Sequence, residues 1–310
     1  AGSLTDVGID AATADKTAVA DQAQPLSSVE IVGRQVDMQS GSTIRVPGGS
    51  VSITALPNPS ELPSGDTPLA EDTGSRIRLA AGSLIDVAGS EAEVDLARNL
   101  VAVELRTNEL RDSPVQRDGA LRGETVFVDS RVGTPVADVS GATAAVPQDV
   151  RERTAAGGTV SLVSRGDVVL AEGATIDVSG GAVNYRGGVL QTSRVVTADG
   201  KAVDISQAAP DRVYQGVSNP TVDVVYGKWG VVETRALSGI GLYQPGYVEG
   251  RDAGTVQFAA PGLVVNGELL GNVRPSVFQR TPETRPLGGR LIVGLQDGSG
   301  LDLPDYRAPS

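Results

Sequence analysis

The chain contains no cysteine and no histidine, and only 3% of its 310 residues are aromatic. The two missing residue types exclude disulfide bonds, His- or Cys-ligated metal sites and a catalytic triad whose base is histidine. The low aromatic content means that a core must be built from Val, Ile, Leu and Ala instead of large rings. Cysteine can be absent both from cytosolic proteins and from secreted bacterial proteins that cross a membrane unfolded, so its absence leaves the compartment open.

Basic residues are also few, and the net charge is −12. An acidic surface argues against DNA or RNA as a partner and against docking on anionic lipid. No apolar stretch approaches the length of a membrane span, and the first residues do not have the pattern of a signal peptide. We therefore predict no nucleic-acid partner and no membrane insertion, with the acidic charge serving solubility.

The chain does contain a repeated phrase. Arg76–Gly89 reads RIRLAAGSLIDVAG and Asp167–Gly180 reads DVVLAEGATIDVSG, with half of the positions identical. Each copy is a short apolar run, a glycine break, a second apolar run and another glycine. Repetition of a strand–turn–strand unit predicts a β-solenoid, in which each coil packs on its neighbours.

A second phrase extends this unit to three strands. GTVSLVSRGDVV (158–169) aligns with GTVQFAAPGLVV (254–265) without a gap, and the full unit covers 157–181. Its strands are expected at 159–163, 167–171 and 175–178. Three short strands per coil predict an all-β fold, a three-sided right-handed parallel β-helix, with the 39 glycines serving its corners.

Several segments interrupt the repeat. The polar stretch Leu56–Ser75 separates two elements that are nearly adjacent in the second copy, so we expect a loop inserted at a corner. The Ala-rich stretch Asp10–Gln24 is consistent with a short helix or a loop. Residues 135–141 (PVADVSG) are expected to rejoin the repeat. The predicted organisation is irregular sequence or the start of a fragment over 1–40, coils over 41–90 with the loop 56–75, an insertion or irregular coils over 91–156, a coil over 157–181, an aromatic-containing insertion over 182–252, and coils with a Pro-containing end over 253–310.

Four aspartates occupy one repeat position: Asp6, Asp86, Asp138 and Asp177. Stacked carboxylates suggest calcium, but the tandem GGxGxD nonapeptides of the calcium-binding β-roll are absent. Alternation of side chains along a strand places these aspartates on the solvent face. We favour solvated or turn-capping aspartates over metal ligands and predict no metal site.

Polysaccharide-cleaving β-helix enzymes use carboxylates and basic residues in a groove, and residues 104–131 contain several side chains of both kinds. The alternation of Asp129 and Arg131 is more typical of a surface ladder pair. No phosphate-binding or dinucleotide-binding glycine motif occurs. We predict no catalytic residue, no enzyme activity and no cofactor. The residues considered are Glu104, Arg106, Glu109, Arg111, Glu124, Asp129 and Arg131.

The candidate ligand or partner contacts are aromatic and lie within one interruption of the repeat: Tyr226, Trp229, Tyr243 and Tyr247. Tyrosine and tryptophan stack on sugar rings and anchor protein contacts. The favoured alternative is a small core that pins the insertion onto the β-helix.

The repeat unit GGTVSLVSRGDVVLAEGATIDVSGG (157–181) resembles the coils of filamentous-haemagglutinin-like exoproteins, which are exported by two-partner secretion. The segments 121–141 and 228–273 are similar to a conserved region of some large members of that family, and the resemblance spans most of 41–295. The segment around W…GYVEG…AGTV is its most specific part. The NPNG-type motif of the family's secretion domain has no clear copy here, because residues 57–60 read PNPS.

The resemblance implies a long rod secreted by, or displayed on the surface of, a Gram-negative bacterium, with a role in adhesion and biofilm cohesion. It also implies an outer-membrane two-partner transporter during export and a polysaccharide or a host or neighbouring cell as the contact. Because AGSLTDVGID at the start is similar to AGSLIDVAGS at 81–90, we expect this chain to be a fragment of such a shaft. Two alternatives stay open: a carbohydrate-binding or polysaccharide-cleaving β-helix, and the shaft of a contact-dependent toxin exoprotein.

Overall fold

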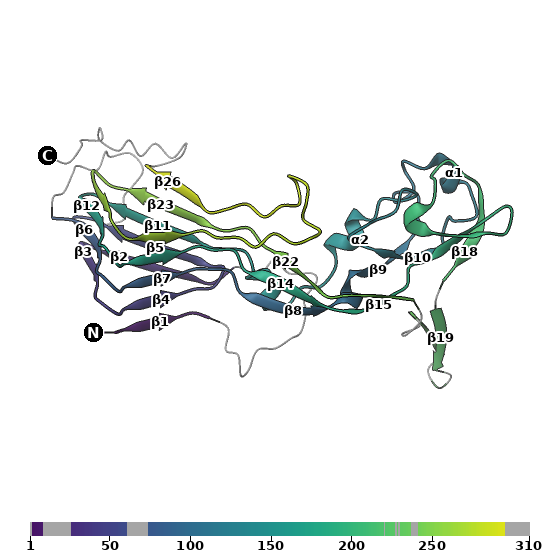
Figure 1. Ribbon diagram of the computed structural model, residues 1–310, viewed down its shortest axis with the longest axis horizontal. Helices are drawn as coiled ribbons and strands as arrows, with labels where there is room; N and C mark the ends of the chain where they lie inside the picture. Colours follow the sequence, from purple (N-terminus) through teal and green to yellow (C-terminus); the bar gives the residue numbers. More distant parts are fainter. Residues whose placement is uncertain are drawn as a thin grey trace.

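A computed structural model describes residues 2–8, 26–60, 74–219, 221–226, 228, 230–236 and 241–294. The protein is all-β, and its described helical segments are short: η1 (Leu96–Asn99), α1 (Pro114–Arg117), α2 (Ser140–Ala144), α3 (Val150–Arg153) and η2 (Ile205–Gln207). Figure 1 shows an elongated molecule with a stack of strands at one end and a smaller lobe at the other.

The stack consists of three sheets in which every pair of neighbouring strands is parallel. Sheet 1 contains β2 (Ser28–Gly33), β5 (Ser50–Ala55), β11 (Thr159–Ser164), β23 (Thr255–Ala259) and β26 (Arg290–Val293). Sheet 2 contains β3 (Gln35–Met38), β6 (Arg76–Leu79), β12 (Asp167–Leu170) and β24 (Gly262–Val265). Sheet 3 contains β1 (Leu4–Asp6), β4 (Thr43–Arg45), β7 (Leu84–Asp86), β13 (Thr175–Asp177) and β25 (Glu268–Leu270).

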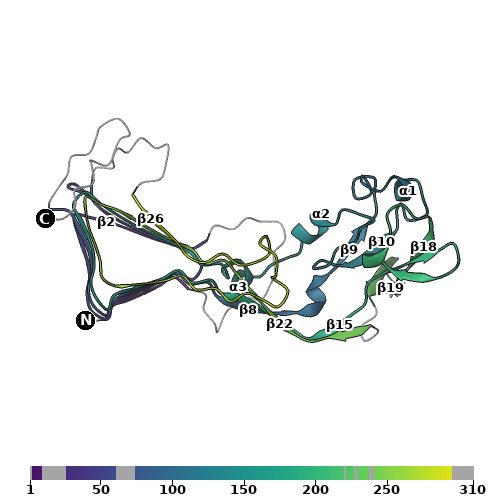
Figure 2. The same cartoon turned by 45° about the horizontal axis from the view of Figure 1, so that its top comes forward.

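The chain passes through the three sheets in turn, and we call one such passage a layer. Strands β5, β6 and β7 form one layer, β11, β12 and β13 the next, and β23, β24 and β25 a third. Viewed close to the stacking direction, the layers superpose in Figure 2. Sequence repetition therefore corresponds to spatial stacking, with each repeat lying directly on the previous one.

The register confirms the alignment of the first repeated phrase, because Leu79 pairs with Leu170 and Ile85 with Ile176. The ungapped alignment of 158–169 with 254–265 is correct in sheet 1, where Val160 pairs with Val256. It is wrong by one residue in sheet 2, where Asp167 pairs with Gly262 instead of Leu263. The corner between β23 and β24 is therefore one residue shorter than the corner between β11 and β12.

The interior of the stack is a set of aliphatic ladders. Its buried cluster consists of Val, Ile, Leu and Ala, with one methionine and one phenylalanine, Phe258. In sheet 3, Ile44, Ile85 and Ile176 occupy successive rungs, and the latter two are fully buried. Along β5, buried apolar positions alternate with outward Ser and Thr, as expected for a strand with one buried face.

Two kinds of corner require glycine. A Cβ on Gly158 would lie 2.0 Å from the carbonyl oxygen of Gly49, and one on Gly254 would lie 1.7 Å from that of Gly158, because adjacent layers meet closely there. At another corner, Gly82 and Gly173 have φ of 76° and 79°, a left-handed conformation that disfavours residues with a Cβ. The glycine breaks in the repeated phrases are thus set by backbone geometry.

The second lobe combines two interruptions of the repeat. The antiparallel pair β9 (Leu100–Glu104) and β10 (Thr125–Asp129) packs with a three-stranded sheet formed by β16 (Arg194–Thr197), β17 (Ala202–Asp204) and β18 (Tyr214–Ser218). We predicted that residues 135–141 rejoin the repeat, and this prediction is wrong. Val136 is fully buried in this second core, and the NH of Asp138 donates to the carbonyl of Glu109. The motif's aliphatic residues are therefore used within the lobe.

A narrow ribbon joins the stack to the lobe (Figure 2). It contains β8 (Glu91–Asp95), β14 (Ala182–Arg186) and β22 (Tyr247–Gly250), followed by the pair β15 (Gly188–Leu190) and β21 (Leu242–Gln244). Strand β14 is parallel to β8 but antiparallel to β22. The hairpin of β19 (Thr221–Tyr226) and β20 (Val231–Ala236) forms its own two-stranded sheet.

Part of the segment 1–40, expected to be irregular, contributes β1, β2 and β3 to the three sheets. The predicted helix or loop Asp10–Gln24 lies outside the described residues. The predicted loop Leu56–Ser75 separates β5 from β6, whereas a single residue separates β2 from β3 at the equivalent corner. Most of this loop also lies outside the described residues.

Candidate functional site

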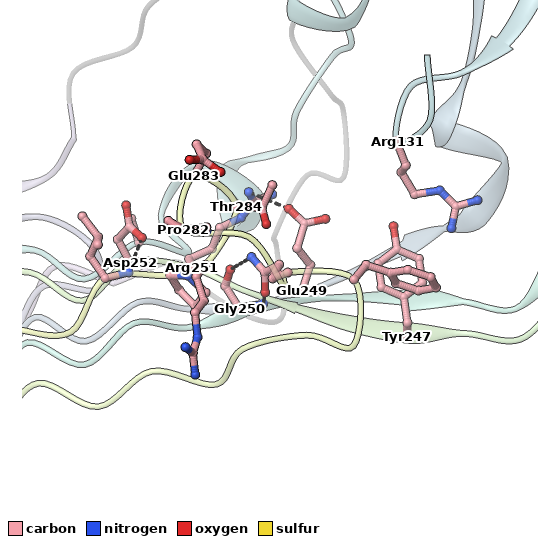
Figure 3. A pocket seen from close by; sticks show the side chains of 15 residues that line it. Arg131, Tyr247, Glu249, Gly250, Arg251, Asp252, Pro282, Glu283 and Thr284 are labelled. Carbon is pink, nitrogen blue, oxygen red and sulfur yellow. Dashed lines mark hydrogen bonds and ion pairs between the residues drawn. The ribbon is translucent and has the colours of Figure 1, made fainter. Parts of the chain in front are cut away.

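A pocket of about 680 Å³ lies where the ribbon, the lobe and the segment after β25 meet. Four parts of the chain line it: Arg131 from the lobe, Ala156, Tyr247 with residues 249–252 from β22 and its continuation, and residues 278–279 with 282–287. Figure 3 shows Tyr247 with Arg131 beside it, and Glu249 further along the same strand. The volume falls within the range of about 300–1,000 Å³ that is typical of small-molecule sites.

Arg131 is held in place by a buried carboxylate. Its Nη2 atom lies 2.5 Å from Oδ2 of Asp129 and its Nε 2.9 Å from Oδ1, so the two side chains form a bidentate pair. Nη2 also donates to Oε1 of Gln244 at 2.5 Å. The side chain of Asp129 is 7% exposed and that of Arg131 is 19% exposed, so the pair is not the surface ladder pair that we expected. Burial is the largest single effect and lowers the pKa of Arg131, but the hydrogen bond that Arg131 donates to Asp129, the charge of Asp129 and the contact with Tyr247 together outweigh burial and raise the net pKa.

Three aromatic rings pack beside this arginine. Tyr185 and Tyr247 are paired across β14 and β22, and their rings stack with centroids 4.6 Å apart and an interplanar angle of 13°. Phe278 meets Tyr247 at 79° with a centroid distance of 4.8 Å. The Arg131 guanidinium carbon lies 5.3 Å from the Tyr247 ring centroid and 5.8 Å from that of Phe278, within the range of cation–π contacts.

Tyr247 joins the ribbon to the lobe. Its hydroxyl accepts a hydrogen bond from Nδ2 of Asn99 at 3.1 Å, and Asn99 lies at the end of η1. Burial is the main cause of the raised pKa of Tyr247 and of the strongly raised pKa of Tyr185. Both phenols therefore remain neutral above physiological pH; the two rings stack on each other, and the Tyr247 hydroxyl is also hydrogen-bonded.

The remaining pocket wall is charged. Glu249 and Arg251 form an ion pair at 2.9 Å, and Oδ1 of Asp252 accepts a hydrogen bond from the NH of Leu287. Arg285 also lines the pocket. Phe278 and Leu287 are 60% and 66% exposed, so the pocket offers open apolar surface beside these polar groups.

The structure gathers only part of the predicted aromatic group. Tyr247 lines the pocket, whereas Tyr243 is 69% exposed on β21 and is not among the lining residues. The backbone of Tyr226 ends β19 and pairs with Val231, and the predicted contact Trp229 lies outside the described residues. Sequence reasoning missed Phe278 as a contact, although an aromatic residue within a Pro- and Arg-rich segment was a usable signal.

The four repeat-position aspartates all cap turns. In each, Oδ1 accepts a hydrogen bond from the NH two residues later, at 2.8 to 3.1 Å. Only Asp6, Asp86 and Asp177 lie in sheet 3, since Asp138 belongs to the second lobe. Among the described residues, no group of three or more Asp or Glu side chains is arranged to hold a metal ion.

Two arginines of the charged set weighed above as catalytic candidates form ion pairs on the surface of the lobe. Arg106 bonds Glu104 at 2.5 Å, and Arg111 bonds Asp138 at 2.7 Å. The carboxylates of Glu104, Glu109 and Asp138 line one shallow pocket of about 240 Å³. The Arg106 hydrogen bond lowers the pKa of Glu104, and hydrogen bonds from Ser140 lower the pKa of Asp138. Low pKa values make both groups poor general acids at neutral pH.

No helix within the described ranges is long and apolar enough to cross a membrane. Comparison with known proteins gives no match: no family model, no curated protein and no solved structure is significantly similar to this chain.

Proposed function

We propose that this chain is a structural segment of a secreted or cell-surface bacterial adhesin or biofilm-matrix exoprotein, of the filamentous-haemagglutinin-like kind. In this proposal the stack is part of a right-handed, three-sided parallel β-helix that extends as a rod. The rod holds binding surfaces away from the cell, and the interruptions of the repeat supply those surfaces.

The observation that carries the proposal is the stacking of sequence repeats in register. Ile44, Ile85 and Ile176 lie on one ladder, and the same three sheets are extended by each new layer. Such a core grows along one axis because each layer contacts only its neighbours. A long, thin, regular scaffold is suited to reach and display, since it gains length without a larger cross-section.

The position of the second lobe supports a display role. The lobe has its own buried core and is joined to the stack by the ribbon of β8, β14 and β22 (Figure 1). Insertions at corners leave the layers on either side paired, as β5 and β11 remain in register across the segment 91–156. The scaffold can therefore carry additional domains without interruption of its core.

The proposal assigns no catalytic step to the chain. The carboxylates Glu104 and Asp138 are each paired with an arginine and have lowered pKa values, which does not suit the acid of a glycosidase pair. An outer-membrane two-partner transporter is the proposed export partner, and a polysaccharide or another cell surface is the proposed contact.

The test is surface labelling of the bacterium that produces the protein. An antibody raised against this chain should stain intact cells or the biofilm matrix, and deletion of the coding segment should reduce attachment. Deletion of the two-partner transporter of that bacterium should abolish the surface signal while the protein accumulates inside the cell. Staining that requires permeabilised cells in the wild type would overturn the proposal.

A further inference from the structure

We infer that the pocket at the ribbon binds a single sugar unit, as the end or a side branch of a polysaccharide. The inference rests on the proposed role of the rod as a carrier of binding surfaces and identifies which surface binds. It combines three properties of the pocket: its size, its exposed aromatic ring and its fixed polar wall.

The apolar part of the site is Phe278. The ring is 60% exposed although its neighbour Tyr247 is half-buried and already stacked on Tyr185. Phe278 therefore keeps open surface while Tyr247 and Arg131 pack against its ring. An exposed ring fixed by its neighbours is suited to pack against the C–H face of a pyranose, because little rotamer entropy is lost on binding.

The polar part of the site is pre-arranged. Glu249 and Arg251 hold each other at 2.9 Å, and Asp252 is fixed by the NH of Leu287. Carboxylate oxygens accept hydrogen bonds and guanidinium groups donate them. This wall can therefore pair with a sugar hydroxyl that donates and with one that accepts. Groups already fixed by intramolecular contacts lose little entropy when a ligand arrives.

Other ligand classes fit this wall less well. A wholly apolar ligand would remove water from Glu249, Arg251 and Arg285 without replacing their hydrogen bonds, which is costly. A phosphate-rich ligand would meet Glu249, Asp252 and Glu283 within the same pocket of a chain with net charge −12. A sugar has both an apolar face and a hydroxyl edge, and the pocket presents both kinds of surface.

The test uses saturation-transfer NMR with the whole chain and four probes: the methyl glycosides of glucose, galactose, N-acetylglucosamine and glucuronic acid. At least one probe should receive saturation at its ring C–H protons, with a Kd of about 1 mM or tighter. Phe278→Ala should weaken that binding by about tenfold. Val277→Ala is the matched control, because Val277 is 62% exposed and adjacent but does not line the pocket, and it should leave the Kd unchanged.

Arg285→Gln separates neutral from acidic sugars. It should weaken binding of the glucuronide more than binding of the neutral probes if the site accepts an acidic unit, and should affect all probes equally if it accepts a neutral one. Absence of saturation transfer to all four probes by the folded chain would overturn the inference, as would equal binding by Phe278→Ala. Either failure leaves the surface-labelling result untouched, so failure of the sugar site is distinguishable from failure of the rod proposal.

Discussion

The pairing of Asp129 with Arg131 gives the sharpest test of how the lobe is held on the ribbon. Arg131→Met keeps the aliphatic stem but removes the guanidinium that bonds Asp129 and Gln244 and lies over Tyr247. Removal of one partner of a buried ion pair costs about 3–5 kcal/mol of unfolding free energy. Because Arg131 is still 19% exposed, we expect a loss near the lower end, about 3 kcal/mol.

The assay is a double-mutant cycle measured by urea unfolding, followed by circular dichroism and tyrosine fluorescence. Asp129→Asn alone should also destabilise the protein, because Arg131 then lacks its charge partner. The double variant should lose less than the sum of the single losses, with a coupling free energy of about 2 kcal/mol. In the single variants, backbone amides of the lobe and ribbon should lose protection from hydrogen exchange before those of the stack, because the stack has a separate core.

The matched control is the exposed pair of Arg186 and Asp95, which has a similar distance of 2.9 Å but side chains that are 62% and 68% exposed. Arg186→Met should change the unfolding free energy by less than about 1 kcal/mol, because solvent screens surface pairs. Additive losses in the Asp129 and Arg131 cycle, or equal losses for the buried and exposed arginines, would refute the reasoning.

Three further predictions concern the stack and the ribbon. Ile176→Ala removes three fully buried carbon groups and leaves a cavity, so calorimetry or urea unfolding should give a loss of about 2.5–4 kcal/mol, whereas outward-facing Thr175→Ala should cost under about 1. Gly158→Ala should prevent close stacking of layers and lower the yield of folded protein, whereas Gly216→Ala, which meets nothing within 4 Å, should not; equal yields would contradict the geometry. Burial raises the pKa of Tyr185, so stability should hold below about pH 10 and decline above it, because the unfolded chain releases this proton first. Tyr185→Phe should flatten that decline in urea midpoints measured against pH, and an unchanged decline would show that another group causes it.

Much of the stack could be predicted from local pattern. Strands of period two, glycines at fixed intervals and two copies of one phrase were enough to place Leu79 opposite Leu170 and Ile85 opposite Ile176. This succeeds because contacts in such a stack join equivalent positions of successive repeats, so sequence alignment and spatial pairing coincide. The ungapped alignment was wrong by one residue at Gly262, because a shorter corner shifts the register there and leaves the hydrophobic pattern unchanged.

The candidate site could not be predicted from local sequence pattern, because its residues lie far apart in the chain. Arg131, Tyr185, Tyr247 and Phe278 come from four separate segments and meet only when the two interruptions fold against the ribbon. Residues 135–141 show the same limit, since a phrase similar to the repeat was used in the core of the lobe.

By itself, the sequence determined the kind of protein this is: a repetitive β chain with an aliphatic interior, solvent-facing aspartates and no histidine or cysteine chemistry. Tertiary structure decided that Asp129 and Arg131 are a buried pair, that Tyr247 packs beside this pair while Tyr243 remains exposed, and that Phe278 completes the pocket. The physical reason is that backbone propensity and side-chain alternation act between neighbours along the chain or between repeats. Burial of a charge or exposure of a ring depends on which distant segments meet.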